Sequence, residues 1–373
     1  MKKYYFLIMI VLGFCSCKKN NSNQVVNNPQ SDVYVAGAEY NGSVNVAKYW
    51  KNGQATALTD GTKDAWVSSI AVVGSDVYVA GYESIGSNTY RAKYWKNGQA
   101  IMLTDGTQSA GAGSIAVAGS DIYVAGAEGD VAKYWKNGQS IPLTDGSLLA
   151  GISSIAIAEN DVYVAGTTVP RNNGYFTTAK YWKNGQAISL TDGTKFSYAN
   201  SIAVAGSNVY VAGAEDGVAK YWKNGQVIPL TDGTNYAVAN SITVVGGDVY
   251  VAGYEQNGGS GNYVAKYWKN GQAVSLSDGT NAAWANSIAV VGNDVYVAGS
   301  NGGALYWKNG QGITLPGGSY VNSIAVVGSD VYVAGTEGNS PNEIATYWKN
   351  GQAISLTDGT NHAHASSIVA IKR

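Results

Sequence analysis

Cysteine, histidine and arginine are scarce in this chain, and their scarcity excludes several kinds of chemistry. Two of the 373 residues are cysteines, both within the first 17 positions, and two are histidines. Beyond position 17 the chain therefore has no thiolate nucleophile, no thiolate metal site and no disulfide. The arginines are Arg91, Arg171 and Arg373. They are too few and too scattered for the convergent arginine cluster of a sialidase-like site.

Charge is also sparse and nearly balanced. Only 13% of the residues are charged, and 24 basic residues face 25 acidic ones. Without a basic excess, nucleic-acid binding is not expected, and the low charge argues against disorder. We find no Ser-His-Asp arrangement, phosphate loop or paired acid, so we predict no catalytic residue, no cofactor and no metal site. Acids peculiar to single repeats, such as Asp64, Glu159 and Glu343, leave a carboxylate pair as the alternative.

The apolar run near the N-terminus is short. Residues 4–14 follow two lysines and are too few to span a bilayer as a helix, which is typical of a signal-peptide core. The next letters, "CSCKKN", resemble the end of a bacterial lipoprotein signal, where the acylated cysteine follows a small residue. Ser16 before Cys17 fits better than Phe14 before Cys15. We predict a lipoprotein signal peptide over residues 1–17 with lipidation at Cys17; an uncleaved anchor is the alternative.

Residues 18–30 are polar, rich in asparagine and without periodicity. They predict a flexible tether that reaches at most ~45 Å when fully extended. Together with the signal, this predicts an exported monomer that is lipid-anchored to the bacterial envelope, at the outer membrane, facing either the periplasm or the cell surface.

The whole chain has 48 glycines and 27 tyrosines, and from residue 31 onward it repeats one sequence pattern. A "DVYVAG"-type segment begins at Asp32, Asp76, Asp121, Asp161, Asn208, Asp248, Asp294 and Asp330. A "YWKNG"-type segment follows each time, with tryptophans at Trp50, Trp95, Trp135, Trp182, Trp222, Trp268, Trp307 and Trp348. Successive tryptophans lie 39 to 47 residues apart, a period that indicates a propeller or a solenoid.

Each copy reads as four short strands, and residues 69–103 illustrate the pattern. "SIAVV", "VYVAG", "AKYW" and "QAIML" are strand-like, with tight turns at "GSD" and at Asn97-Gly98. Four-stranded units repeated radially form a β-propeller. Because the first copy begins at its second strand and residues 366–373 supply an extra first strand, we predict ring closure. The expected fold is an all-β, eight-bladed propeller of four-stranded antiparallel blades over residues 31–373.

The succession "YWKNGQ", "LTDGT", "SIAV" and "DVYVAG" resembles the HAF-type extracellular propeller repeats, which also carry a W-x-N-G hairpin. The resemblance covers nearly all of residues 31–373 and implies a propeller and export. It implies no catalytic residues.

The eight repeated tryptophans are expected to fill the gaps between blades, since Trp brings a large apolar area; a stripe of exposed, ligand-binding rings is the alternative. The distance from the "VAG" glycine to the "YW" tyrosine is 12, 13, 8, 15, 8, 14, 7 and 12 residues in successive copies. From the second copy on, long and short spacings alternate, which indicates duplication of a two-blade unit.

The loops that vary lie on one face of the expected ring, and binding usually occurs at variable loops on a rigid scaffold. The position four residues before the first-strand isoleucine lies on that face. It is occupied by Trp66, Gly111, Gly151, Tyr198, Val238, Trp284, Tyr320 and His364. We call it the collar position. Its rings (Trp66, Tyr198, Trp284, Tyr320 and His364) form our candidate ligand site, and packing against the next blade is the alternative.

These features favour a non-catalytic, membrane-tethered binding protein whose ligand is a glycan. The alternatives are an envelope scaffold that holds a protein partner, and a glycan-active enzyme. His362 and His364 could bind a metal as an H-x-H pair, but coincidence is the preferred interpretation. The aspartates of the "TDG" loops are expected to cap turns, because one carboxylate per loop is too few for calcium.

Overall fold

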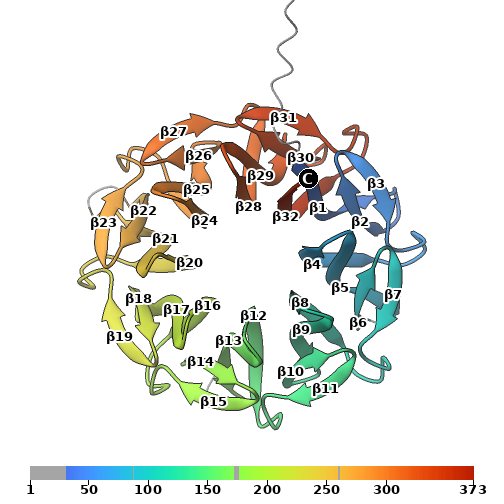
Figure 1. Ribbon diagram of the computed structural model, residues 1–373, viewed down its shortest axis with the longest axis horizontal. Coiled ribbons are helices and arrows are strands. Elements are labelled where there is room, and N and C mark those ends of the chain that lie inside the picture. Colours follow the sequence, from blue (N-terminus) through green and yellow to red (C-terminus); the bar gives the residue numbers. More distant parts are fainter. Residues whose placement is uncertain (1–30, 87, 172–175, 259–260) are drawn as a thin grey trace, which may run out of the picture.

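The computed structural model describes residues 31–373 except 87, 172–175 and 259–260. The predicted signal peptide, Cys17 and the tether lie outside the described residues. Eight antiparallel, four-stranded sheets stand around a ring (Figure 1). The predicted all-β, eight-bladed propeller is confirmed. Within the described part of the chain, no helix is long and apolar enough to cross a membrane.

The strands fall into four sets according to their distance from the ring centre. The first strands, which are innermost (Figure 1), are β4 (Ala65–Val73), β8 (Ala110–Ala118), β12 (Leu148–Ala158), β16 (Ser197–Ala205), β20 (Ala237–Val245), β24 (Ala283–Val291), β28 (Gly318–Val327) and β32 (Ala363–Lys372). The second are β1 (Ser31–Tyr40), β5 (Asp76–Gly86), β9 (Asp121–Glu128), β13 (Asp161–Pro170), β17 (Asn208–Glu215), β21 (Asp248–Gln256), β25 (Asp294–Asn301) and β29 (Asp330–Glu337).

The third and fourth strands form the outer half of each sheet. The third are β2 (Asn45–Lys51), β6 (Thr89–Lys96), β10 (Val131–Lys136), β14 (Thr178–Lys183), β18 (Val218–Lys223), β22 (Tyr263–Lys269), β26 (Ala304–Lys308) and β30 (Ile344–Lys349). The fourth are β3 (Gln54–Ala57), β7 (Gln99–Met102), β11 (Gln139–Pro142), β15 (Gln186–Ser189), β19 (Gln226–Pro229), β23 (Gln272–Ser275), β27 (Gln311–Thr314) and β31 (Gln352–Ser355). Blade 1 is β32 with β1–β3, and blades 2 to 8 follow in chain order from β4–β7 to β28–β31.

The ring is closed where the two ends of the described chain pair. β32 runs antiparallel to β1, with Val35 opposite Ile368 and Ser31 opposite Lys372. The Arg373 guanidinium donates to the Asp32 carboxylate beside this seam. The predicted completion of the first blade by the last strand is therefore confirmed, and no frayed edge remains at the junction.

The core is divided into eight equivalent layers, one between each pair of neighbouring blades. In one layer, Trp135 of blade 3 clusters with Tyr78, Tyr94 and Leu103 of blade 2. All eight repeated tryptophans are at most 1% exposed, so the predicted packing role is confirmed. A buried indole N–H usually donates a hydrogen bond, but most of these do not. Five have no acceptor among the described residues: Trp50, Trp95, Trp135, Trp182 and Trp268.

A glycine in each second strand permits a bulge in the first strand beside it. A Cβ on Gly81 would lie 2.0 Å from the Trp66 carbonyl oxygen, and a Cβ on any of the other seven "VAG" glycines would lie 1.8–2.3 Å from the collar carbonyl oxygen of its own blade. The pairing register shifts at this place in every blade. A bulge re-aims the adjacent side chain, so this glycine helps to set the direction of the collar residue.

Candidate functional site

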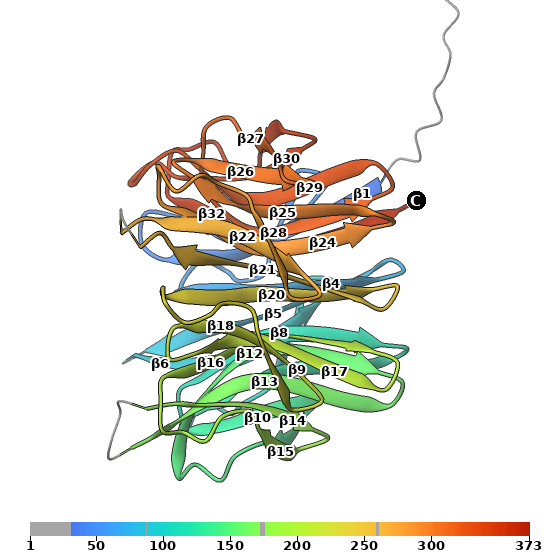
Figure 2. The same ribbon diagram turned by 90° about the vertical axis from the view of Figure 1, so that its left-hand side faces the viewer.

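The two faces of the ring differ as expected from the sequence. The short-turn face, where the C-terminus lies (Figure 2), repeats one polar cluster in almost every blade. In blade 2, Lys96 Nζ lies 2.9 Å from Asp76 and 5.3 Å from the centre of the Tyr78 ring, while Asn97 donates to Asp76. In most blades the equivalent lysine pairs with the equivalent aspartate in the same way. A face of such uniformity offers little distinction between blades.

The opposite face carries the connections that vary. Between the second and third strands, blades 3, 5 and 7 have two-residue connections, formed by Gly129-Asp130, Asp216-Gly217 and Gly302-Gly303. The connections that follow β1, β13, β21 and β29 are longer, whereas in blade 2 the longer spacing that the sequence showed lies in longer strands, β5 and β6. We call this side the variable face.

The collar residues lie on the variable face but do not form one continuous ring of contacts. Trp66 and His364 stack with their centroids 5.5 Å apart. Trp284 instead contacts Tyr263, at 5.9 Å. Tyr198 and Tyr320 are 40% and 66% exposed. The five predicted rings are thus distributed over several sites, and some of their area is used in packing.

The stack of Trp66 and His364 is held by polar neighbours. Trp66 Nε1 donates to the Asp64 carboxylate at 3.1 Å, and His362 Nδ1 lies 2.7 Å from Glu343. Burial, and then the nearby His362, lowers the pKa of His364 to about 4. His364 is therefore neutral at pH 7 and serves as a flat ring beside Trp66.

A second group of rings extends over blades 5 to 7. Tyr263 is central to it: its ring lies 5.0 Å from Tyr254, 6.5 Å from Tyr236 and 5.9 Å from Trp284. Burial and the neighbouring phenols raise the pKa of Tyr254 to about 12, so its hydroxyl remains a donor at any physiological pH. This group combines aromatic faces with phenolic hydroxyls.

Three recesses open on the variable face beside these rings. Recess A, about 560 Å³, is lined by Trp66, Tyr82, Tyr90, Ser109, Ala110, Gly111, Ala127, Gly129 and Asp130. Recess B, about 340 Å³, is lined by Phe196, Tyr198, Ala214, Asp216, Gly217 and Tyr236. Recess C, about 440 Å³, is lined by Ala282, Trp284, Ser300, Gly302, Gly303, Gly317, Gly318, Ser319, Tyr320, Gly338 and Asn339. Four of the five predicted rings line a recess. His364 is not among these lining residues, and its ring stacks on Trp66.

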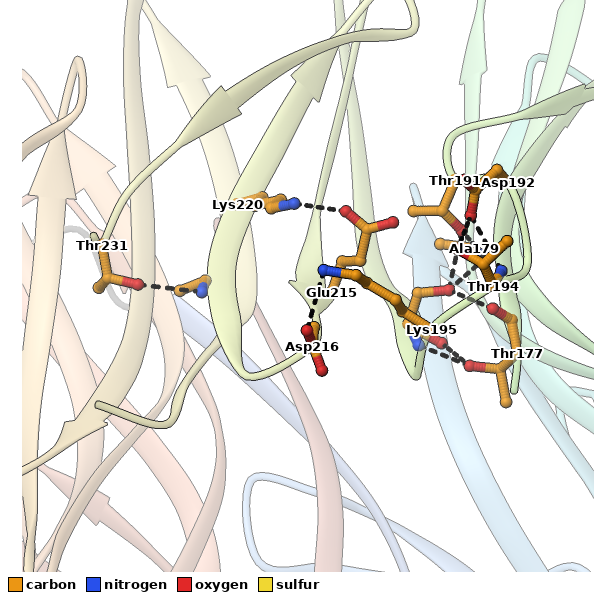
Figure 3. A network of polar contacts seen from close by, with 12 residues as sticks. Thr177, Ala179, Thr191, Asp192, Thr194, Lys195, Glu215, Asp216, Lys220 and Thr231 are labelled. Carbon is orange, nitrogen blue, oxygen red and sulfur yellow. Dashed lines mark hydrogen bonds and ion pairs between the residues drawn. The ribbon is translucent and has the colours of Figure 1, made fainter. Parts of the chain in front are cut away.

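Recess B is braced by a buried polar network (Figure 3). Ser197 replaces the alanine that most blades carry before the collar residue, and it is fully buried. Its hydroxyl donates to the Thr177 carbonyl and contacts Thr191 Oγ1, at 2.6 and 2.8 Å. At the rim, Lys195 lies 2.9 Å from Asp216. The segment before Tyr198 is therefore held to blade 4 through Ser197 and to the β17–β18 connection of blade 5 through Lys195.

The other sequence candidates have structural roles in the contacts that are described. In the "TDG" loops the aspartate accepts from the residue two positions on, as where Asp60 accepts from the Thr62 amide at 2.9 Å and hydroxyl at 2.6 Å. These carboxylates cap turns. Among the described residues, no group of three or more His, Cys, Asp or Glu side chains is placed to hold a metal ion.

Sequence reasoning missed several rings that line the recesses or belong to the group around Tyr263. Tyr82 and Tyr254 directly follow a "VAG" glycine and stand opposite the collar residue of their own blade. Comparing that position across copies would have found them. Tyr236 and Phe196 lie in the connections before β20 and β16, where the repeat offered no signal that distinguishes a lining residue from a loop residue.

Solved structures match the chain in fold. A puromycin-hydrolysing peptidase from Mycobacterium tuberculosis matches with a TM-score of 0.53 and 12% identity, over 79% of this chain and 53% of that one. A prolyl endopeptidase matches with a TM-score of 0.48 and 14% identity, over 82% and 50%. The propeller domain of the trilobed protease from Pyrococcus furiosus matches with a TM-score of 0.47 and 13% identity, over 79% and 96%.

The first of these likenesses concerns the fold alone and says nothing about activity. The chain spans about half the length of the first two of these peptidases. No protein-family model matches the sequence, and no curated protein matches it.

Proposed function

We propose that the protein is an exported, lipid-anchored propeller that binds a glycan on its variable face and does not act on it chemically. The observation that carries this proposal is the recurrence of a partly exposed collar ring in each of three recesses. Ligand sites are concave and mostly apolar, with a few polar groups that fix orientation. A pyranose fits such a site, because its C–H face packs on a flat ring while its hydroxyls reach polar groups at the edge.

Polar groups of the right kind stand beside the rings. Recess A includes Asp130 and Ser109, and recess C includes Ser300, Ser319 and Asn339. Carboxylate, hydroxyl and amide groups can accept from or donate to sugar hydroxyls. The combination therefore supports a carbohydrate better than a purely apolar ligand.

The export and anchoring parts of the proposal come from the sequence of the first 30 residues. An acylated Cys17 followed by a polar tether would leave the propeller outside the cytoplasm, where glycans are plentiful. Metabolic labelling with a palmitate analogue tests this part: the chain should carry the label, and Cys17→Ser should lose it. A labelled Cys17→Ser chain would contradict the assignment of Cys17.

The binding part is tested by a glycan array probed with the full chain in detergent. We expect retention on a defined set of sugars, reduced at least tenfold by Trp66→Ala or Trp284→Ala. Met102→Ala is the matched control, because Met102 is 48% exposed on the outer strand β7, away from the collar position. All variants should keep the far-UV circular dichroism of the parent.

Three results would reject the proposal. A silent array together with one envelope protein captured by cross-linking would favour a scaffold. Turnover of chromogenic glycosides would contradict the non-catalytic assignment. Sugar binding that neither tryptophan substitution weakens would place the ligand elsewhere on the molecule.

A further inference from the structure

The three recesses share two features, a collar ring and a short connection between a second and a third strand. The ring of recess A, Trp66, comes from the preceding blade, whereas Tyr198 of recess B and Trp284 of recess C belong to the same blade as the short connection. Each includes the two-residue connection of an odd-numbered blade: Gly129-Asp130 in recess A, Asp216-Gly217 in B and Gly302-Gly303 in C. Blade 1 also has an odd number, but its connection, residues 41–44, is two residues longer than that of blade 3. The recesses thus accompany the short connections.

The recesses lie at three separate places around the ring. Recess A lies between blades 2 and 3, recess B between blades 5 and 6, and recess C between blades 7 and 8, so B and C stand about a quarter-turn apart and A is farther from both (Figure 1). They belong to one rigid framework, because every blade packs on the next through a buried layer. Their relative positions are therefore fixed before any ligand arrives.

The recesses are close to electrically neutral. The Asp130 carboxylate of recess A pairs with Arg171, and Asp216 of recess B lies 2.9 Å from Lys195. The described residues that line recess C include no Asp, Glu, Lys, Arg or His. A neutral ligand is preferred in such sites, because an acidic one would meet carboxylates without an uncompensated cation to balance it.

Resting on the function proposed above, we propose that the recesses are three separate subsites for one neutral polysaccharide. A polymer with repeating sugar units, or a branched glycan with several equal ends, can occupy more than one recess at once. The second and third contacts are then intramolecular, and avidity can exceed the affinity of one subsite by about 10²–10⁴-fold. A single short oligosaccharide gains none of this.

The test compares polymers with short oligosaccharides on the full chain in detergent. The probes are laminarin, dextran and mannan, each with its own tetrasaccharide, and acidic alginate as the charge contrast. By isothermal titration we expect up to three tetrasaccharides per chain and at least 100-fold tighter binding of the matching polymer. Tyr198→Ala, at an exposed position, should remove one tetrasaccharide site and lower polymer affinity at least tenfold. Met102→Ala should change neither.

Fluorine NMR of 5-fluorotryptophan-labelled protein separates the subsites. Of the ten tryptophans, eight are buried between blades, and Trp66 and Trp284 line recesses A and C. Both of these resonances, assigned with Trp66→Phe and Trp284→Phe, should shift with saccharide while the other eight do not.

The outcomes distinguish this inference from the proposed function. Binding of one tetrasaccharide per chain, with no gain for the polymer, would overturn the three-subsite inference and leave glycan binding intact. Tighter binding of alginate than of every neutral polymer would overturn the choice of a neutral ligand. Failure of every sugar, on the array and in titration, would overturn both.

Discussion

Replacing Gly81 with alanine should destabilise the ring, because the added Cβ has no room. It would lie 2.0 Å from the Trp66 carbonyl oxygen, where an ordinary contact is at least 3.4 Å. The nearest atom belongs to the backbone, so no side chain can swing aside. β4 and β5 would have to separate locally by roughly 1.4 Å, which breaks adjacent ladder hydrogen bonds.

Two such bonds are worth about 1 kcal/mol each, so the strand separation should cost about 2 kcal/mol. Gly111→Ala is the matched control. Its Cβ would meet only Tyr82 Cδ1, at 3.6 Å. Replacing glycine by alanine at a compatible position raises the free energy of unfolding by about 0.4–1 kcal/mol, because alanine lowers the conformational entropy of the unfolded chain. The free energies of unfolding of the two variants should therefore differ by about 2–3 kcal/mol.

Urea unfolding followed by tryptophan fluorescence measures this difference. Gly81→Ala should also disturb the stack of Trp66 and His364, since the bulge sets the direction of Trp66. Equal stability of the two variants would refute the reasoning, because it would mean that β4 and β5 do not approach each other as closely as the bulge requires.

Two further predictions concern His364 and the closing strand. The pKa of His364 is about 4 in the folded chain and about 6.5 when unfolded. The unfolded state thus binds more protons between these values, and the free energy of unfolding should fall by at most about 3 kcal/mol as pH drops from 7 to 4. Urea unfolding at a series of pH values should show a shallower fall for His364→Phe; identical profiles would contradict the assignment. Truncation after residue 365 removes the seam and should abolish the cooperative melt, whereas loss of Arg373 alone removes an exposed ion pair and should leave the melt nearly unchanged. A truncated chain with a native melt and an unchanged small-angle scattering profile would show that closure is dispensable.

Much of the fold could be predicted because the residues that define the strands and turns of each blade are close together in the sequence. Asn97-Gly98 has positive φ at both residues, 50° and 85°, as the tight hairpin requires. Each "VYVAG" run is buried without a break, as in β5, because the second strand is packed on both faces between neighbouring blades. Repetition multiplied each weak local signal eight times, which made the blade count and the closing strand readable.

The candidate site was predicted only in part, because its residues are neighbours across blades. Trp66 and Tyr198 were found by their place in the repeat. Tyr263, which contacts Tyr254 and Trp284, was not found, because it begins β22 directly after a connection whose length changes from blade to blade. Which rings stay exposed depends on the side chains of the next blade, and no local pattern carries that information.

The sequence by itself determined the strands, the turns, the buried tryptophans and the number of blades, since these depend on contacts within one repeat or between identical faces. Tertiary structure alone decided that the collar rings divide among separate recesses and that His364 backs Trp66. Those arrangements arise where non-identical loops from different blades meet, and their packing depends on the shape of both partners at once.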